Sequence, residues 1–222
     1  MQWSIGRPFV PPSLLDRLDR ARLRRAALRY AAHGWAVTPG ACLTGHRFTC
    51  GRPGCPIKTC HPAAESWEDE AGTDPARVAG WWRHRPHTVL LATGAALDVL
   101  DVPAALGLRV LGAERAEGRG PVAVTAAGRW MFLVRPGLPL RPELEHRLDV
   151  VRHGHGSWIP APPSRILEGP VRWAVPPERT QWRLPAAEVV QGMLTDALGS
   201  PHPTPDGHPL VPRQLSTSRR AA

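Results

Sequence analysis

The sequence predicts an α+β domain, and three observations lead to this fold class. Apolar residues recur at helical spacing over residues 14–32, near the start of the chain. Short apolar runs separated by glycine or proline turns follow, which is the pattern of strands and hairpins. Acidic residues stand within or beside several of these runs. With 222 residues, of which 42% are hydrophobic, the chain is long enough to bury a substantial core.

The chain is strongly basic. Basic residues outnumber acidic ones by 28 to 19, which gives a formal net charge of +9, and Lys58 is the only lysine. Guanidinium groups bind phosphates bidentately, so an arginine-rich surface suits nucleic acid. A GC-rich genome would produce the same arginine bias, and both explanations stay open. The apolar runs are too short to span a bilayer, and the N-terminus lacks a signal-peptide pattern. We therefore expect no membrane association and a cytoplasmic location.

The N-terminal part is expected to hold a long helix. Residues 1–12 are proline-rich and predict an extended segment, and the folded domain is expected to span 13–198. The helix should run from Leu14 to Ala32, with Gly34 as its C-terminal cap. Its arginines form either a solvated basic face or a contact surface for nucleic acid. A first core strand is expected at 35–38.

All four cysteines fall within residues 42–61. Three of them are separated by four residues each, and turn residues stand between them. In a cytoplasmic protein such a cluster favours a metal site over disulfides. Structural zinc takes four nitrogen or sulfur ligands. Reduced structural thiols and redox chemistry are the alternatives. The expected zinc ligands are Cys50, Cys55 and Cys60 together with either His61 or Cys42.

Two apolar runs at the centre of the chain, 89–91 and 96–102, flank a glycine turn and predict adjacent buried strands. Asp98 and Asp101 interrupt the second run. A carboxylate on a buried strand is costly unless it is paired or holds a metal. One explanation is that an aspartate caps the turn into a helix after Pro103. The other makes Asp101 a divalent-metal ligand at the end of a strand.

The remaining elements follow from capping residues, helical spacing and short apolar runs between turns. In chain order, we expect a loop at 67–72, a helix opened by Asp74-Pro75 and ended by Pro86, a helix at 103–116, a hairpin of 122–125 and 130–134, a short helix after Pro142, a hairpin of 148–152 and 157–161, a strand at 171–175 and a helix at 185–198. Residues 199–222 lack periodicity and predict a disordered tail.

Several segments, taken in order, resemble the prim-pol domain, the N-terminal domain of bifunctional DNA primase/polymerases in the archaeo-eukaryotic primase superfamily. The match covers roughly residues 14–175, most of the folded chain, and the segments are specific as a set. The resemblance implies an RRM-like core sheet with hairpins, flanked by helices, with residues 42–61 as a small Cys/His-rich insert. The segments are AAHGWAVTPG, TDPARVAGWW, LLATG followed by VLDV, TAAGRWMFLV, LDVVRHGHGSWIPAPPS and GPVRWAV.

The chemistry of this family is metal-assisted nucleotidyl transfer, so the resemblance implies Mg²⁺ or Mn²⁺ as a cofactor in an active member. Asp101 matches the first aspartate of the family's metal-binding pair, and Pro103 stands where the second is expected. Trp130 stands at the position of a histidine that contacts the incoming triphosphate. Asp149 matches the third carboxylate, and Arg152 matches a basic residue of the same motif.

These departures favour a prim-pol-like domain that binds nucleic acid or nucleotide with reduced or lost nucleotidyltransferase activity. Each lost group removes transition-state stabilisation. The expected partners are single-stranded or primer-template DNA and an NTP or dNTP, with a separate replication helicase as a further candidate. The residues expected to contact nucleotide or nucleic acid are Arg129, Trp130, Arg152, His153 and His155.

Two alternatives stay open. An active metal-dependent DNA primase/polymerase would need a rearranged ligand set made of Asp98, Asp101 and Asp149, with His153 or His155. Residues three apart on a strand point to opposite faces, so Asp98 could join Asp101 only through a bulge. The other alternative is a regulatory or scaffold protein that uses the fold for protein contacts.

Overall fold

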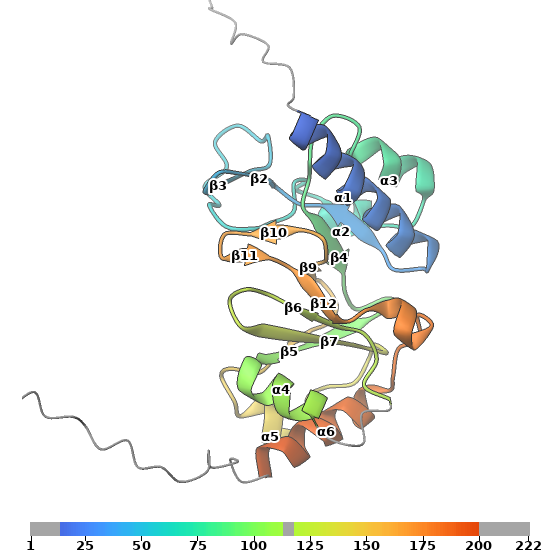
Figure 1. Cartoon of the computed structure of the whole chain (residues 1–222), viewed down its shortest axis with the longest axis vertical. Coiled ribbons are helices and arrows are strands. Elements are labelled where there is room, and N and C mark those ends of the chain that lie inside the picture. The colour runs from blue at the N-terminus through green and yellow to red at the C-terminus, as the bar shows by residue number, and fades with distance from the viewer. Residues whose placement is uncertain (1–13, 113–117, 200–222) are drawn as a thin grey trace, which may run out of the picture.

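The structure, a computed structural model, describes residues 14–112 and 118–199. The predicted extended segment at 1–12 and the predicted tail beyond Gly199 lie outside these residues. Figure 1 shows strands in the middle of the molecule, with helices α1 and α3 at one end and helices α4, α5 and α6 at the other. The fold class is α+β, as predicted.

Helix α1 (Leu14–Ala32) has the predicted bounds. It ends where Gly34 adopts a φ of +79°, and the Gly34 amide donates to the carbonyl of Ala31 at 3.0 Å. One face of the helix is buried and includes Leu23 and Tyr30, while most of its arginines are exposed. Helix α3 (Pro75–Trp81) packs against it. The Asp74 side chain caps α3 by accepting from the Arg77 amide at 2.7 Å, as Asp74-Pro75 predicts.

Beside α1 and α3 lies a three-stranded antiparallel sheet in the order β1-β4-β9. Val37 of β1 is opposite Leu91 of β4, and Leu91 is opposite Ile159 of β9. These three side chains are buried and belong to the core beneath α1. The strands are β1 (Val37–Pro39), β4 (Val89–Ala92) and β9 (Trp158–Pro160).

A five-stranded antiparallel sheet in the order β12-β6-β7-β5-β8 forms the centre of the molecule. One face of this sheet is turned toward α1. The other face packs against helices α4 (Ala104–Gly112) and α6 (Ala187–Gly199), and the short α5 (Pro142–Glu145) contacts α6. The hairpin of β6 and β7 was predicted, as were β12 and α6 to within a few residues. The strands are β5 (Asp98–Pro103), β6 (Val122–Val124), β7 (Arg129–Val134), β8 (Val151–His153) and β12 (Arg172–Val175).

The two faces of the five-stranded sheet bury two separate cores. On β7, Met131 and Leu133 join the core on the α1 side, whereas Phe132 and Val134 join the core on the α4 and α6 side. This alternation follows from the two-residue repeat of a strand. The side on which a β5 or β7 residue lies can therefore be taken from its position in this alternation.

The prediction that residues 89–91 and 96–102 form adjacent strands is wrong about their pairing. Both are strands, but β4 pairs with β1 and β9, while β5 pairs with β7 and β8 in the other sheet. Gly94, with a φ of +101°, lies in the connection between them, and its amide donates to the carbonyl of Leu97 at 2.8 Å. Apolar runs show that a segment is a buried strand and leave its partner undefined.

The predicted hairpin of 148–152 and 157–161 is wrong for the same reason. Strand β8 pairs with β5, and β9 pairs with β4, so residues 154–156 carry the chain from one sheet to the other. The backbone of His155 approaches Gly94 so closely that a Cβ on Gly94 would lie 2.3 Å from its Cα. The two chain crossings between the sheets therefore pack against each other.

Several short elements differ from the predicted ones. Residues 67–72 were predicted as a loop, but α2 (Trp67–Glu70) forms there. Helix α3 ends at Trp81, before the predicted end at Pro86, and α4 is described to Gly112. No helix of the described part of the chain is long and apolar enough to cross a membrane. Three pieces were not predicted, namely the hairpin of β2 (Cys42–Thr44) and β3 (Arg47–Thr49), the hairpin of β10 (Arg165–Ile166) and β11 (Gly169–Pro170), and the 3-10 helix η1 (Pro177–Thr180).

Candidate functional site

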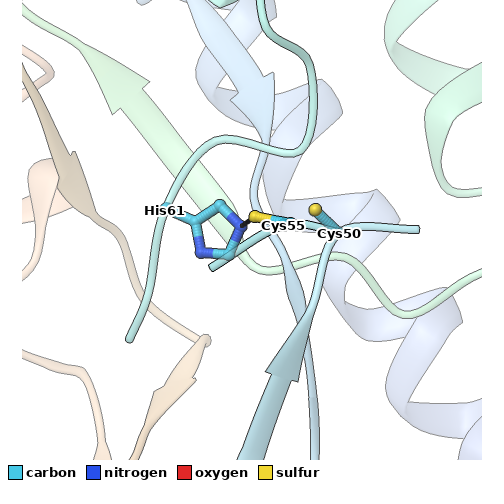
Figure 2. Close-up of side chains that lie close together, drawn as sticks. All are labelled: Cys50, Cys55 and His61. Carbon is cyan, nitrogen blue, oxygen red and sulfur yellow. Dashed lines mark hydrogen bonds between the residues drawn. The ribbon is translucent and has the colours of Figure 1, made fainter. Parts of the chain in front are cut away.

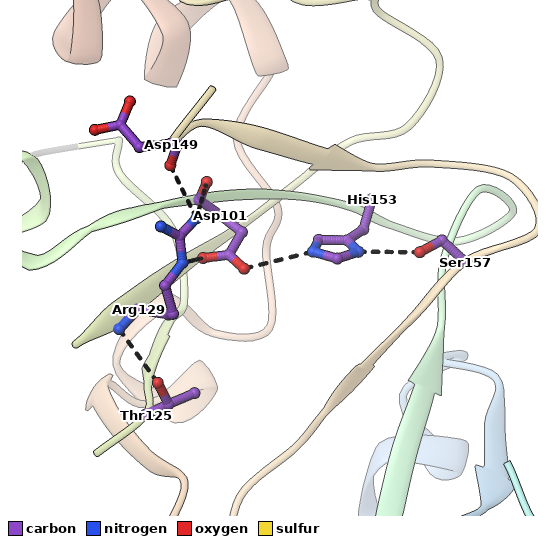
Figure 3. A network of polar contacts seen from close by, with 6 residues as sticks. All are labelled: Asp101, Thr125, Arg129, Asp149, His153 and Ser157. Carbon is purple, nitrogen blue, oxygen red and sulfur yellow. Dashed lines mark hydrogen bonds and ion pairs between the residues drawn. The ribbon is translucent and has the colours of Figure 1, made fainter. Parts of the chain in front are cut away.

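Asp101 lies at the centre of a polar network on the α1-side face of the five-stranded sheet (Figure 3). The Arg129 guanidinium donates from Nε to Asp101 Oδ1 at 2.9 Å. Its Nη2 donates to the backbone carbonyls of Asp101 and Asp149, each at 3.0 Å. The pairing of β5 with β7 brings these side chains together. Arg129 is opposite Pro103, which is two residues from Asp101 on the same face of β5.

His153 approaches the other oxygen of the same carboxylate. Its Nε2 lies 3.5 Å from Asp101 Oδ2, and its Nδ1 lies 3.0 Å from the hydroxyl oxygen of Ser157. His153 is opposite Val99 on β5, so it shares the sheet face of Asp101. Each oxygen of the Asp101 carboxylate therefore faces a basic side chain, and the contact with His153 is an ion pair when the imidazole is protonated.

The Asp149 carboxylate pairs with a different arginine. Arg147 donates from Nε to Oδ1 at 3.0 Å and from Nη2 to Oδ2 at 2.8 Å. This hydrogen bonding from Arg147 lowers the pKa of Asp149 below its usual value. Figure 3 shows the Asp149 carboxylate turned away from Asp101, while the Asp149 carbonyl accepts from Arg129. The two carboxylates do not converge on one point.

Asp98 lies on the opposite face of the sheet from Asp101. Its Oδ2 accepts from Arg152 Nε at 3.1 Å and from the Gly137 amide at 3.1 Å, and its side chain is 2% exposed. The pairing of β5 with β7 runs without interruption from Asp98 to Pro103, so no bulge re-aims Asp98. Neither Asp98 nor Arg152 belongs to the Asp101 network.

A second cluster lies in the insert between β1 and α2. One ligand atom from each of Cys50, Cys55 and His61 falls within 4.8 Å of the others (Figure 2). Cys55 Sγ lies 3.5 Å from His61 Nε2, and His61 Nδ1 lies 2.7 Å from the carbonyl oxygen of Thr59. That carbonyl accepts a hydrogen bond when Nδ1 carries the proton, which leaves the Nε2 lone pair facing the thiols. The cluster could hold a metal ion.

The other two cysteines lie outside this group. Cys42 is buried with its Sγ 3.5 Å from His87 Nδ1, and burial raises its pKa to about 11. Burial likewise raises the pKa of Cys60 to about 12. For Cys50, burial opposes ionisation, but hydrogen bonding with His61 and Arg52 outweighs it and lowers the pKa to about 6. Of the five expected ligands, the structure brings together three.

Comparison with protein families places the chain. The family model described as the N-terminal domain of bifunctional DNA primase/polymerases, Prim-Pol, matches residues 27–189, which is most of the chain. The chain belongs to the prim-pol family. A comparison with curated proteins finds no match.

Prim-pol domains are typically metal-dependent, and the residues of this one do not fit a pair of catalytic divalent ions. Such a pair needs carboxylates that converge, so that it can stabilise the attacking and leaving oxygens. Pro103 shares the face of Asp101 but offers no ligand atom from its side chain. The Arg129 guanidinium already lies between the Asp101 carboxylate and the Asp149 carbonyl. One oxygen of the Asp101 carboxylate is therefore already bonded to a protein cation.

Trp130, which the resemblance matches to a histidine, packs against α4. It lies on the α4 side of the sheet, opposite Val102, and a Cβ on Gly107 of α4 would lie 2.5 Å from its ring. The neighbouring Arg129 faces Asp101 instead. His155 is exposed in the crossing between the sheets, and its side chain forms no hydrogen bond or ion pair with Asp101 or the other described residues of the network.

The sequence did not predict which basic side chains pair with Asp149 and Asp101. Arg147 neutralises Asp149, and its position two residues earlier in the chain was the only sign of this ion pair in the sequence. Arg129 was expected to contact nucleotide, but its pairing with Asp101 depends on the register of β5 against β7. In this prim-pol domain the network can attract and orient an anion, since it presents Arg129 and His153 on one face.

Proposed function

We propose that this prim-pol domain binds nucleic acid or nucleotide in the network of Asp101, Arg129 and His153, and has reduced or lost nucleotidyltransferase activity. The observation that carries the proposal is the Arg129 guanidinium, which bonds to the Asp101 carboxylate and to the backbone carbonyls of Asp101 and Asp149. A divalent ion at Asp101 would have to displace this internal cation.

The expected loss of activity is large. Removing one group that stabilises developing charge typically lowers kcat by about 10²–10³-fold. This chain lacks both the second metal-binding aspartate, at Pro103, and the triphosphate-contacting histidine, at Trp130. Asp98, the candidate replacement, lies on the far face of the sheet and is paired with Arg152. Two such losses without a substitute leave little catalysis.

Binding of an anion is supported by the charges that remain. Arg129 is 30% exposed, and its Nη1 forms no hydrogen bond with the described residues. His153 is 23% exposed beside it. Both sit on a chain with a net charge of +9. A phosphate can approach Nη1 while Nε and Nη2 keep Arg129 in place.

The experiment on activity is a primer-extension and de novo priming assay with Mg²⁺ and with Mn²⁺. The matched control is the Asp101→Ala/Asp149→Ala double variant. We expect no product above that control. Product that disappears in the control would establish the alternative, an active DNA primase/polymerase with rearranged ligands, and would contradict the proposal.

The experiment on binding measures the affinity of the full chain for a single-stranded oligonucleotide across a range of salt concentrations. Phosphate contacts release counterions, so affinity should fall as salt rises, and Arg129→Gln should lower the log–log slope by about 0.7 for one lost contact. Arg47→Gln, on the distant β2–β3 hairpin, is the control. Affinity that does not depend on salt would favour the regulatory or scaffold alternative.

The partners proposed here are single-stranded or primer-template DNA and an NTP or dNTP, in DNA replication. A separate replication helicase is a further proposed partner, and the proposed location is the cytoplasm. These proposals rest on the family and on the basic charge of the chain.

We also propose that the insert binds a structural zinc ion through Cys50, Cys55 and His61, with a further ligand to complete the four that such sites take. Elemental analysis of protein purified without added metal is expected to find stoichiometric zinc. Cys55→Ser should lower the zinc content, and Cys42→Ser, outside the cluster, should retain it. Protein without zinc would overturn this proposal.

A further inference from the structure

A hollow of about 690 Å³ lies at the β12 edge of the five-stranded sheet. This is the edge opposite β8, and β12 is separated from β5 by β6 and β7. At about 4.8 Å per strand, the hollow is roughly 14 Å from the strand of Asp101. Its volume falls in the usual range for small-molecule sites. We call it the β12-edge pocket, and its chemistry comes from Arg119, Arg179, Arg183, Ala174, Val175 and Leu184.

The charged lining of the β12-edge pocket is entirely basic among the described residues. Arg119 is 8% exposed and donates from Nη1 to the carbonyl of Leu111 at 2.8 Å, so its guanidinium is held in place. Arg179 and Arg183 are exposed, and neither forms an ion pair with a described residue. Glu178, the acidic residue of η1, pairs with Arg29 instead. The exposed guanidinium groups of Arg179 and Arg183, which line the same hollow, favour an anion there.

A strained turn orients the two exposed arginines. Gln181 and Trp182, between them in sequence, have φ values of 52° and 62°, which side chains other than glycine rarely adopt. The Trp182 amide donates to the carbonyl of Pro177 at 2.8 Å, and the Trp182 ring stacks on His33 at 3.6 Å. Such strain persists where surrounding packing holds it, and it is concentrated at functional sites.

We propose that the β12-edge pocket binds the phosphate of a nucleotide-sized ligand through Arg119, Arg179 and Arg183. The apolar part of the lining, formed by Ala174, Val175 and Leu184, offers a surface for the ligand's base. Guanidinium groups suit phosphate because their planar N–H groups match its oxygens bidentately. This site is separate from the network of Asp101 and does not depend on the function proposed for it.

The test is calorimetric titration of the full chain with ATP at low salt and without divalent metal. Arg179→Gln/Arg183→Gln is the test variant, and Arg22→Gln/Arg25→Gln, exposed on α1, changes the net charge by the same amount. Arg129→Gln reports on the Asp101 network. Adenosine, which lacks phosphate, is titrated alongside.

We expect ATP to bind far more tightly than adenosine. The Arg179→Gln/Arg183→Gln variant should weaken ATP binding by about tenfold or more, since it removes two charged contacts. Arg22→Gln/Arg25→Gln should leave that binding within about twofold of the unsubstituted chain. Arg129→Gln removes any ATP held by the Asp101 network and should retain the ATP bound in the β12-edge pocket, whose arginines it leaves intact. Absence of ATP binding, equal losses in the two double variants, or a loss confined to Arg129→Gln would each overturn the proposal, and the last would support the Asp101 network alone.

Discussion

The carboxylate of Asp101 is 16% exposed and meets Arg129 on one oxygen and His153 on the other. A partly buried charge is costly without a partner, and here the side chains of Arg129 and His153 are the partners. The same rule holds on the other face of the sheet, where Arg152 neutralises Asp98. At the scale of single residues, both carboxylates of β5 are paired with basic side chains of the same sheet.

The ion pair of Asp101 and Arg129 should be measurable as a coupling energy. In a double-mutant cycle of Asp101→Ala and Arg129→Ala, urea unfolding is expected to give a coupling of about 1–2 kcal/mol, since both groups are largely buried and the hydrogen bond is charge-assisted. Asp101→Asn, which keeps an acceptor for Arg129, should cost less than Asp101→Ala. A coupling below about 0.5 kcal/mol would mean that the pair does not hold Arg129 in place.

The pairing of Asp149 with Arg147 has a pH signature. Because Arg147 lowers the pKa of Asp149, the pair stabilises the native state above the usual pKa of 3.8, and this contribution is lost as the pH falls through the lowered value. Arg147→Gln should raise the pKa of Asp149, as measured by ¹³C NMR of its carboxyl carbon. Arg172→Gln, on the opposite edge strand, should leave that pKa unchanged. An unchanged pKa in Arg147→Gln would contradict the pairing.

At the scale of elements, the site depends on strands that leave one sheet and enter the other. The chain passes from β4 to β5 at Gly94 and from β8 to β9 at residues 154–156. Both crossings meet at the close approach of Gly94 to the backbone of His155. This contact fixes β5 and β8 relative to the three-stranded sheet, and so fixes Asp101 and His153.

Substitution at this crossing separates steric contact from backbone strain. Gly94 and Gly137 have φ values of +101° and +107°, but a Cβ on Gly94 would meet His155 at 2.3 Å, whereas one on Gly137 would have nothing within 4 Å. Gly137→Ala is expected to lower the free energy of unfolding by about 1–2 kcal/mol through backbone strain alone. Gly94→Ala should lower it by about 1–3 kcal/mol more, because the backbone must also shift away from His155. Equal costs in urea unfolding would show that the crossings do not pack as described.

At the scale of the whole molecule, the five-stranded sheet is shared by both cores. Tyr30, Trp35, Trp173 and Trp182 gather on the α1 side, where their rings contact one another. The other core holds α4, α5 and α6 against the opposite face. Because one sheet forms a wall of each core, loss of packing on one side should weaken both.

We therefore expect the described part of the chain to unfold as one cooperative unit. Leu194→Ala, in the core beneath α6, should lower the free energy of unfolding by about 2–5 kcal/mol. Tryptophan fluorescence reports mainly on the α1 side, and its unfolding transition should shift by as much as the transition followed by circular dichroism. Leu148→Ala, at a fully exposed position, should change stability by at most about 0.5 kcal/mol. A fluorescence transition that stays in place while circular dichroism shifts would indicate two independent domains.

The sequence by itself determined the elements whose signals are local. Helix α1 ends at Ala32 because apolar spacing and Gly34 define its face and its cap. The hairpin of β6 and β7 was predictable because its turn residues separate two short apolar runs. The order of these segments also indicates the prim-pol family, to which the family comparison assigns the chain. Periodicity, capping and turn chemistry involve residues a few positions apart, so one chain is enough to show them.

Only the tertiary structure decided which strands pair and which charges meet. Asp101 contacts Arg129, 28 residues away, and Asp98 contacts Arg152, 54 residues away, because strand register places them together. The cluster of Cys50, Cys55 and His61 excludes Cys42, which the chain places beside His87. Partner choice and register depend on which surfaces are buried together across the whole fold, and local patterns do not contain that information.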